Sequence, residues 1–376
     1  MGRIEAKRAL LWTGAVALVL LLVGCAPPEP LRVGFLGGVS GRVADLGIAG
    51  RDAALLAVEM RNARGGVDGR PVELLIEDDG QDPERAREAL ARLIARNVAA
   101  VVGPMTSAIA LAVVPQANAA RLTLVSPTVT TNALTGLDDH FFRVLAPTAA
   151  HVAKSADYYF HERGLHRLAL IYDLRNKAYT ESWASDFRAA FVAAGGVIVD
   201  EERFVSGEAV HFTELAAQLL DRSPDGVIVI ANSVDTALLI QKIRQRDAAV
   251  AIGTSEWAAT ERLIELGGRA VEGVVVSQYL DRDSREPQYV GFREAYRSRF
   301  GREPGYPGLT AFDATNVVLD ALDSRQSGQS LKQAILARRE FAGAQGAIRF
   351  DAAGDSGRGT FLSVIRDGDF QPLGPS

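Results

Sequence analysis

The feature that most constrains this chain is a repeated alternation of short apolar runs with longer amphipathic stretches. The first run, Leu31 to Gly37, is almost entirely hydrophobic, which is typical of a parallel strand that is buried on both faces. A stretch with helical spacing follows from about Leu46 to Arg64, and Gly65 ends it. Because strand and helix recur in this order, the sequence predicts a doubly wound α/β lobe.

The alternation restarts after a short apolar stretch, Phe141 to Leu145, that Pro147 closes. A predicted helix from about Thr148 to Arg163 opens the second series, which continues to a strand near Gly273 to Ser277. This restart predicts a second α/β lobe, in agreement with the two domains expected of a chain of 376 residues.

The last hundred residues have a different pattern. Past Gln278 the spacing predicts three helices, and the last of them ends at about Arg338. The chain then ends in a predicted hairpin that pairs residues 347–350 with residues 360–366.

The N-terminus has the pattern of a bacterial lipoprotein signal. Basic residues at positions 3, 7 and 8 precede the apolar run Ala9 to Val23, and small residues then lead to Cys25, the only cysteine. We expect residues 1–24 to be removed, Cys25 to carry lipid, and residues 25–30 to form a stiff tether. The alternative is a plain secretory signal or a short anchor helix with a chance cysteine. The prediction is a protein outside the cytoplasm, lipid-anchored on the periplasmic face or the cell surface.

No motif in the sequence supports an enzyme, a metal site or a bound cofactor. His161 and His166 are five residues apart rather than four, and Gly164 should end the helix between them. Neither a nucleophile elbow nor a phosphate-binding P-loop occurs. The net charge of −5 argues against a nucleic-acid partner. We therefore predict a non-enzymatic protein without metal or cofactor.

The stretch from Val101 to Thr131 contains two hydroxyl-rich turns. Gly103-Pro104 end one predicted strand and precede Ser107 at a helix N-terminus, while Ser126-Pro127 end the next strand and precede Thr128 and Thr130. Because adjacent parallel strands end at the same edge of a sheet, both turns should meet where α/β sheets bind ligands. Helix N-termini and hydroxyl groups suit a small anion such as a carboxylate. Alternatively, these Ser and Thr residues only cap helices.

Several segments together resemble one family. The segments are Asn62 to Pro71, Glu77 to Pro83, Val101 to Pro104 and Val125 to Thr130, with the lipoprotein signal before them. In this order they resemble the leucine/isoleucine/valine-binding proteins of ABC importers, which are type I periplasmic binding proteins. The resemblance covers nearly all of the chain that follows the signal.

The resemblance implies two doubly wound α/β lobes, joined by three crossovers, that close on a small ligand in the cleft. Lobe 1 would hold residues 31–146 and 279–344, and lobe 2 residues 147–278 and 345–376. The ligand's carboxylate would lie on lobe 1. There Ser107 would supply a hydroxyl and helix amides, Thr128 its backbone, and Thr130 its hydroxyl.

The other pocket residues implied by the resemblance depart from the family pattern. An acidic residue of lobe 2 should bind the ligand's ammonium group; register by Gly253 places Ser255 there, with Glu256 one position later. Glu256 is the predicted ammonium ligand, and a solvated loop carboxylate is the alternative. Tyr179 would be the aromatic of lobe 2, and Met105 the side chain at the first turn. Aromatic residues of the family are replaced at two further pocket positions, Leu46 and Asn232.

These replacements predict a reshaped pocket, for a more polar or larger amino acid or for a different carboxylate. The predicted function is an extracytoplasmic solute-binding lipoprotein that captures an amino acid, of branched-chain type or a related small carboxylate, by lobe closure. It would deliver this ligand to an ABC transporter permease. The alternative is a receptor of the same fold that senses the ligand and signals to a partner protein without transport.

Overall fold

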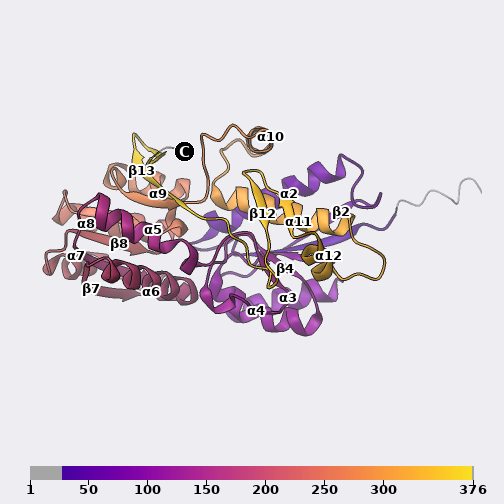
Figure 1. The fold of residues 1–376 in the computed structure, drawn as a ribbon, viewed down its shortest axis with the longest axis horizontal. Helices are drawn as coiled ribbons and strands as arrows, with labels where there is room; N and C mark the ends of the chain where they lie inside the picture. The colour runs from indigo at the N-terminus through magenta and orange to yellow at the C-terminus, as the bar shows by residue number, and fades with distance from the viewer. Residues whose placement is uncertain (1–27, 375–376) are drawn as a thin grey trace, which may run out of the picture.

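The computed structural model describes residues 28–374, so the predicted signal peptide and Cys25 lie outside the described residues. Two α/β lobes lie end to end along the long axis of the molecule (Figure 1). One lobe is built on a five-stranded sheet and the other on a seven-stranded sheet. Within the described residues, no helix combines the length and the hydropathy needed to cross a membrane.

The sheet of lobe 1 is parallel throughout, in the order β2-β1-β3-β4-β5. Its strands are β1 (Leu31–Gly37), β2 (Val72–Asp78), β3 (Val101–Val102), β4 (Leu124–Ser126) and β5 (Phe141–Arg143). Its helices are α2 (Ala44–Asn62), α3 (Pro83–Ala95), α4 (Ser107–Ala120), α10 (Pro287–Phe300), α11 (Tyr306–Asp323) and α12 (Leu331–Arg338).

Helices cover both faces of this sheet. Val101 packs in the cluster that contains the apolar faces of α3 and α4, whereas Val102 packs in the cluster that contains α2 and α11. Successive residues of a strand point to opposite faces, which explains why both valines are fully buried. The predicted doubly wound lobe is therefore confirmed.

The sheet of lobe 2 has the order β14-β13-β10-β9-β8-β6-β7. Its parallel strands are β6 (Arg167–Asp173), β7 (Val197–Phe204), β8 (Gly226–Ile230), β9 (Ala251–Thr254) and β10 (Val275–Gln278). The antiparallel strands β13 (Phe361–Arg366) and β14 (Asp369–Pro372) complete one edge. Its helices are α5 (Val152–Asp157), α6 (Lys177–Ala193), α7 (Phe212–Asp221), α8 (Ser233–Arg246) and α9 (Glu261–Gly267).

The chain passes between the lobes three times: after β5, after β10 and before β13. The predicted C-terminal hairpin is wrong. Strand β12 (Ala347–Arg349) pairs with β11 (Glu340–Ala342), whereas β13 pairs with β10 and β14. The intervening segment is held on lobe 1, where Asp355 pairs with Arg143. The third crossover thus separates β12 and β13, the two strands that the local pattern predicts to pair.

The predicted helix over residues 148–163 is also divided. A single 3₁₀ turn (Thr148–Ala150) precedes α5, and a π-helical segment (Tyr158–Glu162) follows it. The first break falls at His151, whose φ of −135° is not helical. This break lies in the first crossover, and it turns the buried His151 side chain toward the region between the lobes.

Candidate functional site

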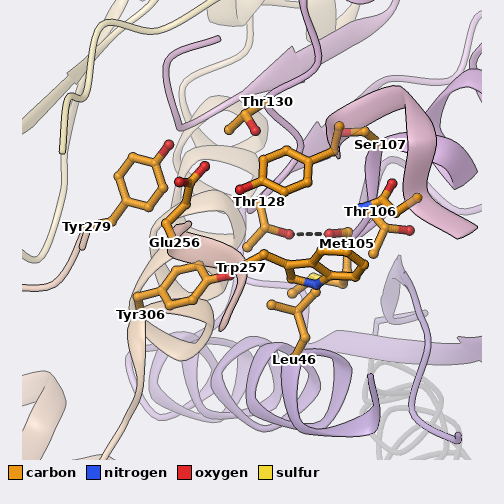
Figure 2. A pocket seen from close by; sticks show the side chains of 12 residues that line it. Leu46, Met105, Thr106, Ser107, Thr128, Thr130, Glu256, Trp257, Tyr279 and Tyr306 are labelled. Atoms are coloured by element: carbon orange, nitrogen blue, oxygen red, sulfur yellow. Dashed lines mark hydrogen bonds between the residues drawn. The ribbon is translucent and has the colours of Figure 1, made fainter. Parts of the chain in front are cut away.

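A cavity of about 20 Å³ lies between the two lobes and is lined by side chains of both (Figure 2). Lobe 1, including its helix α11, contributes Leu46, Met105, Thr106, Ser107, Thr128, Thr130 and Tyr306. Lobe 2 and the end of its strand β10 contribute Asn176, Tyr179, Glu256, Trp257 and Tyr279. The structure therefore brings together seven of the eight predicted ligand-binding residues, and Asn232 is the exception.

The first turn of lobe 1 depends on a glycine. Gly103 has a φ of +123°, and a Cβ atom there would lie 2.2 Å from the carbonyl oxygen of Leu36 in β1. Only glycine fits such a close approach of two backbones. The turn leads directly into α4, so that Ser107 occupies its first position and faces the cavity. The N-terminus of this helix carries partial positive charge.

The second turn is tied to the first by hydroxyl groups. Ser126 Oγ donates to the carbonyl of Pro104 at 2.8 Å, and the hydroxyl of Thr128 donates to the carbonyl of Met105 (Figure 2). In contrast, the buried hydroxyl of Thr130 forms no hydrogen bond within the described part of the chain. A buried hydroxyl without a partner is costly, so Thr130 is available to a ligand.

Two apolar side chains form the floor of lobe 1. Met105 fills a space that Gly37 of β1 and Gly50 of α2 leave open, since a Cβ atom on either glycine would lie 2.7 Å from the methionine side chain. Leu46, in the first turn of α2, is 2% exposed and lies beneath Trp257 in Figure 2. The position where the resemblance implies an aromatic ring thus holds a smaller aliphatic side chain.

Among the residues that the structure describes, Glu256 is the only acidic residue that lines the cavity. It follows β9 and is buried, with Oε2 accepting from Trp183 Nε1 at 3.1 Å. Its Oε1 lies 3.5 Å from Nε2 of His151 and has no hydrogen-bond partner among residues 28–374. Burial raises the pKa of Glu256, but the contact with His151 and smaller polar contributions outweigh burial, and the pKa lies below its ordinary value. This direction includes the attraction of a cationic His151, in whose presence the carboxyl group is ionised at neutral pH.

Aromatic side chains enclose the remaining space. The rings of Tyr179 and Trp257 meet edge to face at 5.8 Å, and those of Tyr279 and Tyr306 lie 6.1 Å apart. Burial raises the pKa of all three tyrosines well above its ordinary value. Their hydroxyls therefore stay neutral, and that of Tyr179 has no hydrogen-bond partner in the described chain.

Sequence reasoning missed several lining residues. Trp257 directly follows the predicted Glu256, Tyr279 directly follows the last parallel strand of lobe 2, and Tyr306 opens α11 after Gly305. An aromatic residue next to a predicted strand end or crossover was the signal that could have identified these three as lining residues. Asn176 gave no such signal, because it enters the site through a 3₁₀ turn, Leu174–Asn176, that the sequence pattern did not predict.

Comparison with known proteins shows which family this chain belongs to. The family model described as periplasmic binding protein matches residues 30–362. The chain belongs to the periplasmic binding protein family. The resemblance inferred from the sequence is thus confirmed, and membership implies a solute-binding protein that acts outside the cytoplasm.

Relatives of this periplasmic binding protein include the Leu/Ile/Val-binding protein BraC3 of Rhizobium johnstonii. It is 22% identical over 330 residues, which are 86% of this chain and 88% of that protein. Among solved structures, LivJ of Streptococcus pneumoniae in complex with isoleucine aligns with a TM-score of 0.85 at 22% identity, over 92% of this chain and all of that one. A solute-binding protein of R. palustris in complex with benzoate aligns with a TM-score of 0.82 at 20% identity, over 92% and 96%. These structural likenesses establish the fold.

In this periplasmic binding protein, Asn232 lies outside the cavity and caps a helix. Its side-chain oxygen accepts from the backbone N–H groups of Val234 and Asp235, both at 3.0 Å, and its nitrogen donates to the Asp235 carboxylate at 2.7 Å. The predicted contact between Asn232 and a ligand therefore finds no support in the geometry. An N-cap is an ordinary role for asparagine at the start of a helix.

Polar contacts join the lobes beside the cavity. Asp45 of α2 accepts hydrogen bonds from Ser233 at 2.6 Å and from Thr260 at 2.7 Å, both in lobe 2. Arg42 pairs with the fully buried Asp235 at 2.5 Å. Because each of these contacts requires the lobes to be close together, the structure of this periplasmic binding protein is a closed arrangement.

Proposed function

We propose that this protein is an extracytoplasmic solute-binding lipoprotein that captures an α-amino acid between its lobes and delivers it to an ABC transporter permease. The proposal rests on the difference in polarity across the cavity, where a side with hydrogen-bond donors faces a side with a negative charge. Hydroxyl groups and a helix N-terminus lie on lobe 1, and the ionised, buried Glu256 lies on lobe 2. A zwitterion with its carboxylate toward Ser107 and its ammonium toward Glu256 matches both sides.

The same difference in polarity supplies a mechanism for closure. A ligand that contacts both lobes stabilises the closed arrangement over the open one by its differential affinity for the two states. The free cavity is about 20 Å³, room for only about one water molecule. We therefore infer that the lobes separate to admit the ligand and close on it with some adjustment of the lining side chains.

An amino acid is favoured over a plain carboxylate by Glu256. One neighbouring structure contains isoleucine and another contains benzoate, so the fold alone leaves both ligand classes open. In this chain a ligand with only a negative charge would face the ionised carboxylate of Glu256 at close range, without an ammonium group to offset it. Removal of water from the closed cleft would increase that repulsion.

The proposal also covers the membrane anchor, the ligand-binding residues and the boundaries of the lobes. Lipid on Cys25 would anchor the protein to the membrane, and residues 26–30 would form the stiff tether that keeps the lobes near a permease. The proposed ligand-binding residues are Ser107, Thr128, Thr130, Tyr179, Glu256, Met105 and Leu46. The proposed lobes keep their predicted division at residues 146 and 278. The segment from residue 345 to the crossover before β13 is assigned to lobe 1, where β12 pairs with β11 and Asp355 pairs with Arg143.

A thermal-shift screen of residues 26–376 tests the proposed function. The probes are the twenty protein amino acids, aromatic acids such as benzoate, and dicarboxylates. A ligand present at 1,000 times its dissociation constant should add about 4 kcal/mol to the free energy of unfolding. Stabilisation by at least one α-amino acid supports the proposal. Stabilisation by plain carboxylates alone, with none by any amino acid, contradicts it.

The proposed contacts between lobe 1 and the ligand's carboxylate can be tested separately. Ser107→Ala and Thr130→Ala should each weaken amino-acid binding by about 1–3 kcal/mol, the contribution of a hydrogen bond to a charged group. Isothermal titration calorimetry measures the loss, and Thr213→Ala on the exposed surface of α7 is the matched control. If both variants bind as tightly as the wild type, neither hydroxyl contacts the ligand.

A further inference from the structure

His151 is the one histidine that contacts the proposed ammonium site, although it does not line the cavity. It lies at the helix break of the first crossover and is 4% exposed. Nδ1 lies 3.1 Å from the carbonyl oxygen of Pro147. Nε2 lies 3.3 Å from the hydroxyl of Tyr279 and 3.5 Å from Oε1 of Glu256. Both ring nitrogens therefore have fixed partners.

These partners determine what protonation of His151 would do. A carbonyl oxygen only accepts, so Nδ1 carries a hydrogen and donates to Pro147. In the neutral imidazole, Nε2 is then an acceptor, and the hydroxyl of Tyr279 donates to it. In the protonated imidazole, Nε2 carries a hydrogen too and faces the Glu256 carboxylate as a cation. The charge of His151 thus decides whether Glu256 already has a counter-ion.

The other charged groups near His151 are engaged elsewhere. Arg143, which lies close enough to Tyr279 to influence its pKa, is paired with Asp355. On α6, Asp186 accepts from Thr148 at 2.7 Å and from Asn132 at 2.8 Å. On α5, the ammonium group of Lys154 donates to the carbonyl of Thr360 at 3.3 Å. Tyr279, which faces the imidazole from the end of β10, is neutral because burial raises its pKa. Glu256 is therefore the charge that protonated His151 would neutralise.

We propose that His151 is a positioning residue whose protonation opposes amino-acid binding, so that capture of the ligand expels a proton from the imidazole. This inference rests on the proposed function, because it requires the ligand's ammonium group to lie at Glu256. Two cations cannot share one buried carboxylate without repulsion. The ligand ammonium takes the place of the imidazolium charge, and the proton leaves to solvent. A ligand without an ammonium group would have the opposite linkage, since protonated His151 would then shield it from Glu256.

The experiment measures the apparent affinity of the wild-type protein for an equimolar mixture of the twenty amino acids at pH 8 and pH 5.5, by thermal shift. Affinity should fall at pH 5.5, by at most about tenfold per pH unit for one coupled proton. His151→Gln and His151→Asn should remove most of this dependence. His161→Gln, on an exposed side chain of the same lobe, should retain it.

The possible outcomes separate this inference from the proposed function. Equal affinity at both pH values in the wild-type protein overturns the role of His151 while amino-acid binding stands. The same holds if the pH dependence survives in a folded His151 variant. Affinity that rises at pH 5.5 overturns the pairing of ammonium with Glu256. If the mixture causes no stabilisation at either pH, the proposed function fails, and this inference fails with it.

Discussion

Glu256→Gln should weaken amino-acid binding more than any other single substitution in the cleft. The glutamine keeps nearly the same shape but lacks the negative charge, so the ligand ammonium would be buried without a counter-ion. Removing one partner of a buried, hydrogen-bonded charge pair costs about 2–5 kcal/mol, which is about 30-fold or more in the dissociation constant. Titration calorimetry at pH 8 measures the loss.

The matched control for this variant is Glu208→Gln, which changes the same residue type in an exposed loop of lobe 2. We expect the control to bind as tightly as the wild type. A thermal melt without ligand shows whether Glu256→Gln is folded, since Trp183 can still donate to the remaining side-chain oxygen. Unchanged affinity in a folded Glu256→Gln protein would mean that another group balances the ligand's positive charge, or that the ligand has none.

Arg143→Ala should cause the largest loss of stability among the ion-pair variants. Arg143 is fully buried at the end of β5, where it donates to Asp355 at 2.6 Å, to the carbonyl of Thr131 at 2.7 Å and to the hydroxyl of Thr135 at 2.7 Å. Truncation leaves Asp355 buried without its counter-ion, which costs about 3–5 kcal/mol. A thermal melt should show a Tm lower by about 5 °C.

Lys332→Ala provides the comparison, because its partner Asp138 is almost fully exposed. Surface pairs contribute little to stability, and this variant should melt close to the wild type. The double variant Arg143→Met/Asp355→Leu removes both charges and should recover part of the loss. If Arg143→Ala melts with the wild type, the pair does not hold the third crossover on lobe 1 as the contacts indicate.

The order of strands and helices could be predicted from the sequence because each parallel strand is short, apolar and bounded by turn residues. Val101-Val102 followed by Gly103-Pro104 is one such signal, and the turn lies where it was expected. The division of the C-terminal region could not be predicted in this way. Local alternation indicates strands, but the choice of partner depends on distant contacts such as Arg143 with Asp355.

The lobe 1 half of the site was predictable because neighbouring strands must end at one edge of the sheet. The lobe 2 half depends on how the first and second crossovers pass beside the cleft. His151 and Tyr279 come from these two crossovers, and no periodic pattern predicts that their side chains meet Glu256. Asn232 differs from them, since its position after β8 indicated the cleft whereas its side chain caps α8.

We propose that a zwitterion bridges Ser107 and Thr130 of lobe 1 and Glu256 of lobe 2. The most direct measurement compares, by titration calorimetry, the tightest-binding amino acid of the screen with its analogue in which a hydrogen replaces the ammonium group. Leucine and 4-methylpentanoate are such a pair. We expect the amino acid to bind at least about 30-fold more tightly, which is the contribution of one buried charge pair. An analogue that binds as tightly as the amino acid, or more tightly, would contradict it.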